Sequence, residues 1–105
     1  MDYKIFVTKD AKEDLNSIVK YLIIEKGNIQ AAQNVLDDYD ATIASLKIIA
    51  GSLKLCDNPR LHKLGYHRIN FLNHKYFIMY RIIDDKVFVD NIFHDLQDYE
   101  KKMYW

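Results

Sequence analysis

The chain has 105 residues, half of them apolar, which is enough for one domain with a modest core and gives no sign of a second. Its fifteen basic and fifteen acidic side chains cancel, so the overall charge does not favour a nucleic acid or a membrane surface as partner. The apolar runs are far shorter than the roughly 20 residues that cross a bilayer, and the N-terminus lacks the pattern of an export signal. We therefore expect a cytoplasmic protein with a single domain over residues 1–105.

Residues that could hold a metal or a cofactor are sparse. The single cysteine, Cys56, excludes an internal disulfide and cannot form a cysteine-rich metal site by itself. The four histidines are spaced too irregularly to predict a metal site: His62, His67, His74 and His94. No nucleotide-binding, zinc-peptidase or serine-hydrolase motif is present in the sequence. We expect no metal and no cofactor.

The first half of the chain predicts a strand followed by a helical hairpin. Alternation from Tyr3 to Val7 indicates a short strand, and Asp10 stands three residues before Glu13, as a helix N-cap does before a carboxylate. Apolar residues then recur at helical spacing until Gly27 and Asn28 interrupt them: Ala11, Leu15, Ile18 and Leu22, widened by Val19 and Ile23.

A second helix is predicted from Asn28, which has the side chain of an N-cap, to Gly51, which stands where a left-handed C-terminal residue is expected. One face of this helix is apolar, formed by Ala32, Leu36, Tyr39, Ile43, Leu46 and Ala50. Together the two helices form a hairpin that buries one side.

The second half of the chain changes to a period of two. After a connection from Ser52 to Gly65, which holds the only proline and a predicted turn, three strands are expected over Tyr66 to Phe71, Tyr76 to Ile83 and Val87 to Phe93. A short final helix is expected from Leu96 to Met103. The predicted fold class is thus α+β: an N-terminal strand, a helical hairpin, a three-stranded antiparallel meander and a short C-terminal helix.

Charge is distributed unevenly along this neutral chain. From Leu53 to Arg81 six basic residues accompany only one acid, Asp57. The folded molecule is therefore expected to present a positive surface along the connection and the first two strands of the meander, which would suit a phosphate backbone; a solvated charged face is the alternative. The candidate RNA- or target-binding residues are Lys54, Arg60, Lys63, His74, Lys75 and, near the C-terminus, Gln97.

Four residues are candidates for chemistry. Arg81 interrupts an apolar strand, so it must either pair with a carboxylate such as Asp90 or line a cleft. Arg68 lies on the polar side of its strand. At the exit of the last strand, His94 could transfer protons near neutral pH and Tyr99 could donate a hydrogen bond.

The stretches Tyr76 to Ile82, Asp84 to Val89 and Ile92 to Tyr99 resemble the C-terminal half of the RelE/ParE family of bacterial toxins. The segment Ala11 to Leu15 and the hairpin after it are similar too, and the resemblance extends from Tyr3 to about Met103. It implies a compact sheet packed on the hairpin, a cognate antitoxin that wraps and neutralises the toxin, and a role in plasmid maintenance or growth arrest.

The family divides over its target. RelE-like members cut messenger RNA in the ribosomal A site, whereas ParE-like members bind and inhibit DNA gyrase without known nuclease activity. Arg68 falls at a basic position of the nuclease group, while Asn70, Phe77 and the pair Leu96 and Gln97 stand where other members carry cations.

From this resemblance we expect a toxin that acts as a metal-independent mRNA endoribonuclease on the ribosome. Arg68 and Arg81 would stabilise charge on the phosphate, and His94 with Tyr99 would transfer or position protons. The alternatives are a gyrase inhibitor without chemistry and an inactive homologue that only binds its antitoxin.

Overall fold

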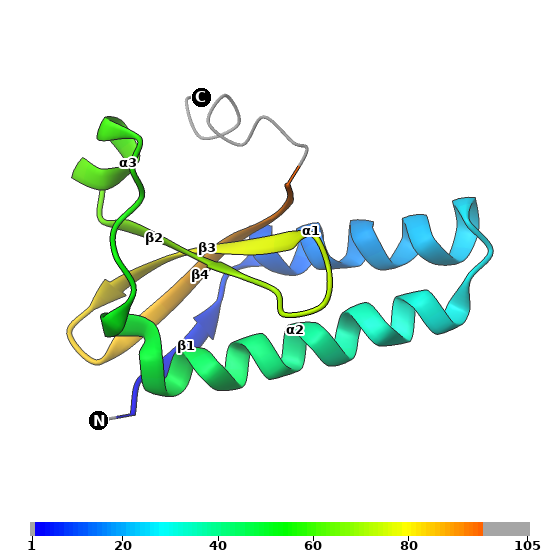
Figure 1. Cartoon of the computed structure of the whole chain (residues 1–105), viewed down its shortest axis with the longest axis horizontal. Coiled ribbons are helices and arrows are strands. Elements are labelled where there is room, and N and C mark those ends of the chain that lie inside the picture. The colour runs from blue at the N-terminus through cyan, green and yellow to red at the C-terminus, as the bar shows by residue number, and fades with distance from the viewer. Residues whose placement is uncertain (1, 96–105) are drawn as a thin grey trace.

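The computed structural model describes residues 2–95 and confirms the α+β class (Figure 1). The elements, in chain order, are strand β1 (Lys4–Val7), helix α1 (Lys9–Lys20), the π-helical turn η1 (Tyr21–Glu25), helix α2 (Ile29–Ile49), the short 3-10 turn η2 (Ala50–Ser52), helix α3 (Pro59–Lys63), and strands β2 (Tyr66–Asn70), β3 (Tyr76–Ile83) and β4 (Lys86–His94). The predicted final helix, Leu96 to Met103, lies outside the described residues.

The strands form one sheet in the order β1-β4-β3-β2. The antiparallel meander of β2, β3 and β4 is as predicted, to within one residue at the strand ends. The N-terminal strand, whose place the sequence did not indicate, pairs in parallel with β4, so that Ile5 lies opposite Val87 and Phe6 opposite Phe88. The first and last strands of the domain are therefore neighbours.

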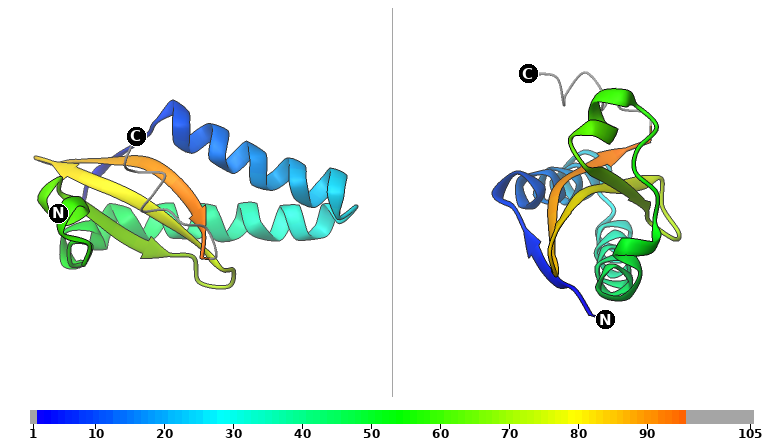
Figure 2. Two further views of the ribbon diagram at one scale, coloured as in Figure 1. Left: turned by 90° about the horizontal axis from the view of Figure 1, so that it is seen from above. Right: turned by 90° about the vertical axis from the view of Figure 1, so that its left-hand side faces the viewer.

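The core lies between α2 and one face of this sheet. Val35 and Leu46 of α2 pack into the same buried cluster as Ile78, Tyr80 and Val87 of the strands. Figure 2 shows the two helices of the predicted hairpin running together beyond the sheet, with α2 along it. In the part of the chain that is described, no helix is long and apolar enough to cross a membrane.

The helix starts are set by two side-chain caps. Asn28 caps α2 as predicted, because its Oδ1 accepts the N–H of Ala31 at 2.9 Å. The predicted cap at Asp10 is wrong. Thr8 takes that place, since its Oγ1 accepts the N–H of Ala11 at 3.3 Å, and Asp10 lies inside the first turn.

Gly51 has a different role from the one predicted. It does not adopt a positive φ, because the positive-φ glycines are Gly27 and Gly65, and α2 continues through it as a 3-10 turn. A Cβ at Gly51 would collide with the hydroxyl of Tyr3, so the residue is small because the N-terminal segment crosses there.

Helix α3 replaces the turn predicted in the connection. Asn58 caps it by accepting two backbone N–H groups, and Pro59 occupies the first turn, where no N–H is required. The connection also carries Cys56 and Leu61 into a second apolar cluster with Phe77, Met79 and Phe93, on the sheet face that points away from the main core. Part of that face is therefore covered.

Candidate functional site

The face of the sheet that points away from α2 holds both arginines predicted for catalysis. Along β3 the side chains of Ile78 and Tyr80 enter the main core, so those of Phe77, Met79 and Arg81 lie on the other side. We call this other side the outer face.

Arg68 lies on the outer face, flat over a neighbouring ring. Its Cζ is 3.7 Å from the ring centroid of Phe77, its Nε donates to Asn70 Oδ1 at 2.9 Å, and its Nη2 donates to Asp95 Oδ1 at 3.2 Å. The residue lines a cleft of about 230 Å³ with Cys56 and others. The guanidinium is thus partly exposed and is paired with the carboxylate of Asp95.

Arg81 forms the ion pair that the sequence suggested. Its Nε and Nη2 both donate to the carboxylate of Asp90, the second contact at 3.3 Å, and Asp90 is only 13% exposed. The hydrogen bond to Asp90 raises the pKa of Arg81. Burial, with a further contribution from Asp90, raises the pKa of Tyr66 to about 12, so its phenol is neutral at physiological pH.

Asp90 is available to Arg81 because β4 is irregular at this point. Met79 pairs with Asn91 whereas Tyr80 pairs with Val89, which leaves Asp90 as the extra residue of a β-bulge. The backbone carbonyl of Asp90 accepts the hydroxyl of Thr8 at 3.2 Å. The bulge residue Asp90 therefore contacts both the N-cap of α1, through its carbonyl, and Arg81 of β3, through its carboxylate.

Asp95 contacts Arg68, but His94, the residue before it, lies on the other face of the sheet from the two arginines. It stacks edge-on against Tyr76 at 5.2 Å between ring centroids, and Tyr76 packs against the main core, so His94 is on the opposite face of the sheet. Tyr76 and Arg81 are five residues apart in β3, about 16 Å along the strand. The structure does not gather Arg68, Arg81 and His94 into one site.

Two predicted site residues, Tyr99 and Gln97, lie outside the described residues. Of the remaining basic candidates, Lys54 forms an exposed ion pair with Asp57 at 3.3 Å, and Lys75 is exposed beside β3. Arg60 and Lys63 are exposed on α3. With Arg68 and Arg81 also paired, the expected positive surface is partly neutralised by carboxylates.

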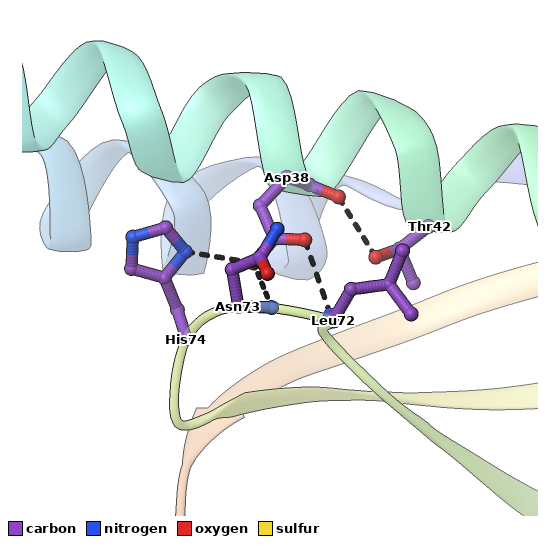
Figure 3. A network of polar contacts seen from close by, with 5 residues as sticks. All are labelled: Asp38, Thr42, Leu72, Asn73 and His74. Carbon is purple, nitrogen blue, oxygen red and sulfur yellow. Dashed lines mark hydrogen bonds and ion pairs between the residues drawn. The ribbon is translucent and has the colours of Figure 1, made fainter.

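His74, which is also a predicted target-binding residue, anchors the turn between β2 and β3 (Figure 3). Its Nδ1 lies 2.7 Å from Asp38 Oδ2, and Asp38 also accepts the backbone N–H groups of Leu72 and Asn73 at 3.1 and 2.9 Å. The side chain of Asp38 is 2% exposed. Burial alone would raise its pKa, but the hydrogen bonds and the charge of His74 leave the pKa lowered.

The role of Asp38 was not predicted from the sequence. A signal was present, because Val35, Asp38 and Thr42 are three and four residues apart and thus lie on one face of α2. A carboxylate on a buried helical face needs partners. Within residues 2–95, no three His, Cys, Asp or Glu side chains lie close enough to hold a metal ion.

The comparisons with known proteins agree with this fold. A family model described as the ParE toxin of the type II toxin-antitoxin system, parDE, matches residues 5–99. A solved structure titled "Chromosomal ParDE TA system from P. aeruginosa" superposes with a TM-score of 0.71, at 15% identity, over 88% of this chain and 95% of that one. That identity is low enough for the structural likeness to concern the fold alone. No curated protein matches the sequence.

Proposed function

This chain belongs to the ParE toxin family of type II toxin-antitoxin systems, and from that premise we propose that it arrests growth by binding DNA gyrase, without cutting a substrate. It would act as one half of a pair, neutralised by its cognate antitoxin until the antitoxin is lost. The first expectation from the sequence was mRNA cleavage, and gyrase inhibition was the alternative. We now favour gyrase inhibition.

The observation that carries the proposal is the separation of the groups expected to perform cleavage. A metal-independent ribonuclease needs a proton acceptor and a cation at one phosphate. Here His94 and the two arginines are on opposite faces of the sheet, and each arginine already holds a carboxylate: Asp95 for Arg68 and Asp90 for Arg81. A negative carboxylate beside each cation opposes the approach of a phosphate.

The test compares two activities of one purified preparation. The toxin is added to gyrase, relaxed plasmid and ATP, and separately to translating ribosomes with a defined transcript. We expect loss of supercoiling and an intact transcript, and we expect added antitoxin to restore supercoiling. Full supercoiling together with new transcript ends would overturn the proposal. If the protein neither inhibits supercoiling nor cuts the transcript, the remaining candidate is a homologue that only binds its antitoxin.

One observation favours ribosome-dependent cleavage as a second candidate. Arg68 lines a cleft with Lys54, Cys56 and Asn70, where a phosphate could reach the guanidinium. If cleavage were the activity, Arg68→Ala and His94→Ala would each reduce growth arrest. Variants that arrest growth as fully as the wild type would exclude this candidate.

A further inference from the structure

A single row of side chains crosses all four strands on the outer face. Phe6 of β1 lies opposite Phe88 of β4, Phe88 lies opposite Arg81 of β3, and Arg81 lies opposite Tyr66 of β2. Because these are register partners on one face, they form a continuous line. We call these four residues the aromatic row.

The members of the aromatic row contact one another. The rings of Phe6 and Phe88 stack with centroids 5.5 Å apart and planes 20° apart. The guanidinium carbon of Arg81 is 5.5 Å from the Phe88 centroid and 6.0 Å from that of Tyr66, so the cation lies between two rings. These contacts, with the ion pair to Asp90, hold the row in one arrangement before any partner binds.

The aromatic row is open at its Phe6 end in the described chain, whereas Tyr66 at its other end packs against the cluster of Cys56 and Leu61. Leu61 and Cys56 cover Phe77, Met79 and Phe93 at the other end of the outer face. In contrast, Phe6 is 45% exposed, and Ile83, the next residue of β3 on the same face as Arg81, is 50% exposed. Phe6 and Ile83 are on the two strands that flank β4, and exposed apolar side chains on one face of a sheet are typical of an interaction surface.

Two lysines lie at the border of the row, beside the acidic turn residues Asp84 and Asp85. Lys4 and Lys86 are register partners in the adjacent row, and both are exposed. Lys4 has a weak contact of 3.9 Å with Asp85, and Lys86 has no ion pair within residues 2–95. At the centre, Arg81 is neutralised by Asp90. A phosphate chain would meet that carboxylate, whereas a protein segment with apolar anchors and acidic neighbours would match both parts of the surface.

We propose that the aromatic row is a docking surface for the cognate antitoxin, whose occupant is an acidic segment with large apolar side chains. The apolar side chains would lie on Phe6, Phe88 and Ile83, and the acidic ones would meet Lys4 and Lys86. Membership of a two-component toxin-antitoxin family makes the antitoxin the partner that must bind this chain tightly, and a rigid, half-apolar surface suits a tight complex. The inference does not depend on the action against gyrase.

Two variants test the apolar and the charged part separately, with the purified antitoxin as probe in titration calorimetry. Phe6→Ala removes an exposed anchor, and Lys86→Glu reverses the border charge without changing the packing of the row. We expect each to weaken antitoxin binding by about tenfold or more. The loss for Lys86→Glu should shrink in high salt, because salt screens exposed charges.

The matched controls lie at the far tip of the hairpin. Ile24→Ala removes an apolar side chain that is 72% exposed, and Lys20→Glu reverses an exposed charge, so each makes the same kind of change as its counterpart. We expect both controls to bind the antitoxin as the wild type does. Thermal unfolding of each variant shows that it is folded before binding is measured.

Three results would overturn the proposal. The first is that folded Phe6→Ala and Lys86→Glu bind the antitoxin with unchanged affinity. The second is that the hairpin controls lose as much antitoxin affinity as these two variants. The third is that the row variants keep antitoxin affinity but lose inhibition of gyrase or binding of a short single-stranded RNA, which would assign the row to the toxin's target. If the wild type does not inhibit gyrase at all, the proposed function fails while the antitoxin measurement still stands.

Discussion

Asp38 is the buried charge on which the turn between β2 and β3 depends. It accepts hydrogen bonds from Leu72, Asn73 and His74, and its side chain is 2% exposed. Nothing else among the described residues replaces these contacts, because each donor points at this one carboxylate in Figure 3. The turn is therefore held on α2 both by these hydrogen bonds and by apolar packing, since Phe71 is buried with its ring 6.3 Å from that of Tyr39, whereas Leu72 is 74% exposed.

Replacement of Asp38 by Asn should lower the free energy of unfolding by about 1–3 kcal/mol at neutral pH, because an amide cannot accept all three hydrogen bonds. Asp37→Asn, next to it on α2 and exposed, is the control and should change the stability little. Urea unfolding of the three proteins measures both values. Equal stability of Asp38→Asn and the wild type would contradict the role given to Asp38.

The same carboxylate makes the stability depend on pH. The folded protein holds the pKa of Asp38 below its ordinary value, so the folded state binds fewer protons than the unfolded state. The stabilisation is complete above the unfolded pKa of about 3.9 and is lost as the pH falls through the folded value. The stability difference between the wild type and Asp38→Asn should therefore shrink below about pH 4. A difference that stays constant to pH 3 would contradict this.

Cys56 is expected to be unreactive. It is 9% exposed, and burial, with the charge of Asp57, raises the pKa of its thiol in spite of Arg68 nearby. Because the thiolate is the reactive form, Ellman's reagent should modify the native protein slowly and the protein in guanidinium chloride at once. Rapid modification of the native protein would show that the cleft beside Arg68 activates this thiol.

At the scale of the elements, Thr8 connects α1 to the sheet. Its Oγ1 accepts the N–H of Ala11 and its hydroxyl donates to the bulge carbonyl of Asp90. Thr8→Ala removes both contacts and should cost about 1–2 kcal/mol. Thr8→Ser keeps the hydroxyl and should retain most of the stability, as measured by chemical unfolding. A loss as large in the serine variant as in the alanine variant would assign the effect to the methyl group.

Most elements could be predicted from local patterns because local chemistry determines them. An almost wholly apolar run predicted β3 from Tyr76 to Ile83, and the side chain of Asn28 predicted the start of α2. The predictions that were wrong or incomplete were of two kinds. At Thr8 and Gly51 several residues fit a cap equally well, and at α3 five residues are too few for a periodic signal, although Asn58 and Pro59 were present to indicate a start.

The candidate site depends on contacts that are distant in sequence. The Arg81 and Asp90 pair was foreseen because the two strands are joined by a tight turn. The aromatic row was not foreseen, because Phe6 reaches Phe88 only through the parallel pairing of the first and last strands. The sequence of neither strand alone indicates this pairing. His94 was grouped with the arginines because the sequence did not show which face of the sheet it occupies.

In the whole molecule, the two faces of the sheet have different roles. The inner face is the core on α2, and the outer face carries two arginines that are each paired with a carboxylate, beside an exposed aromatic row. Such a surface is suited to binding other proteins and poorly suited to transferring protons at a phosphate. We therefore propose that the toxin acts by occupying its target.

Titration of the toxin against a fixed amount of gyrase tests this claim most directly. An inhibitor that acts by occupancy reduces supercoiling in a dose-dependent way that saturates near one toxin for each binding site, and it releases the enzyme unchanged when antitoxin is added in excess. We predict that result, with the transcript intact in a parallel ribosome reaction. Complete arrest of translation by a small fraction of one toxin per ribosome, with cut transcripts and gyrase unaffected, would contradict it.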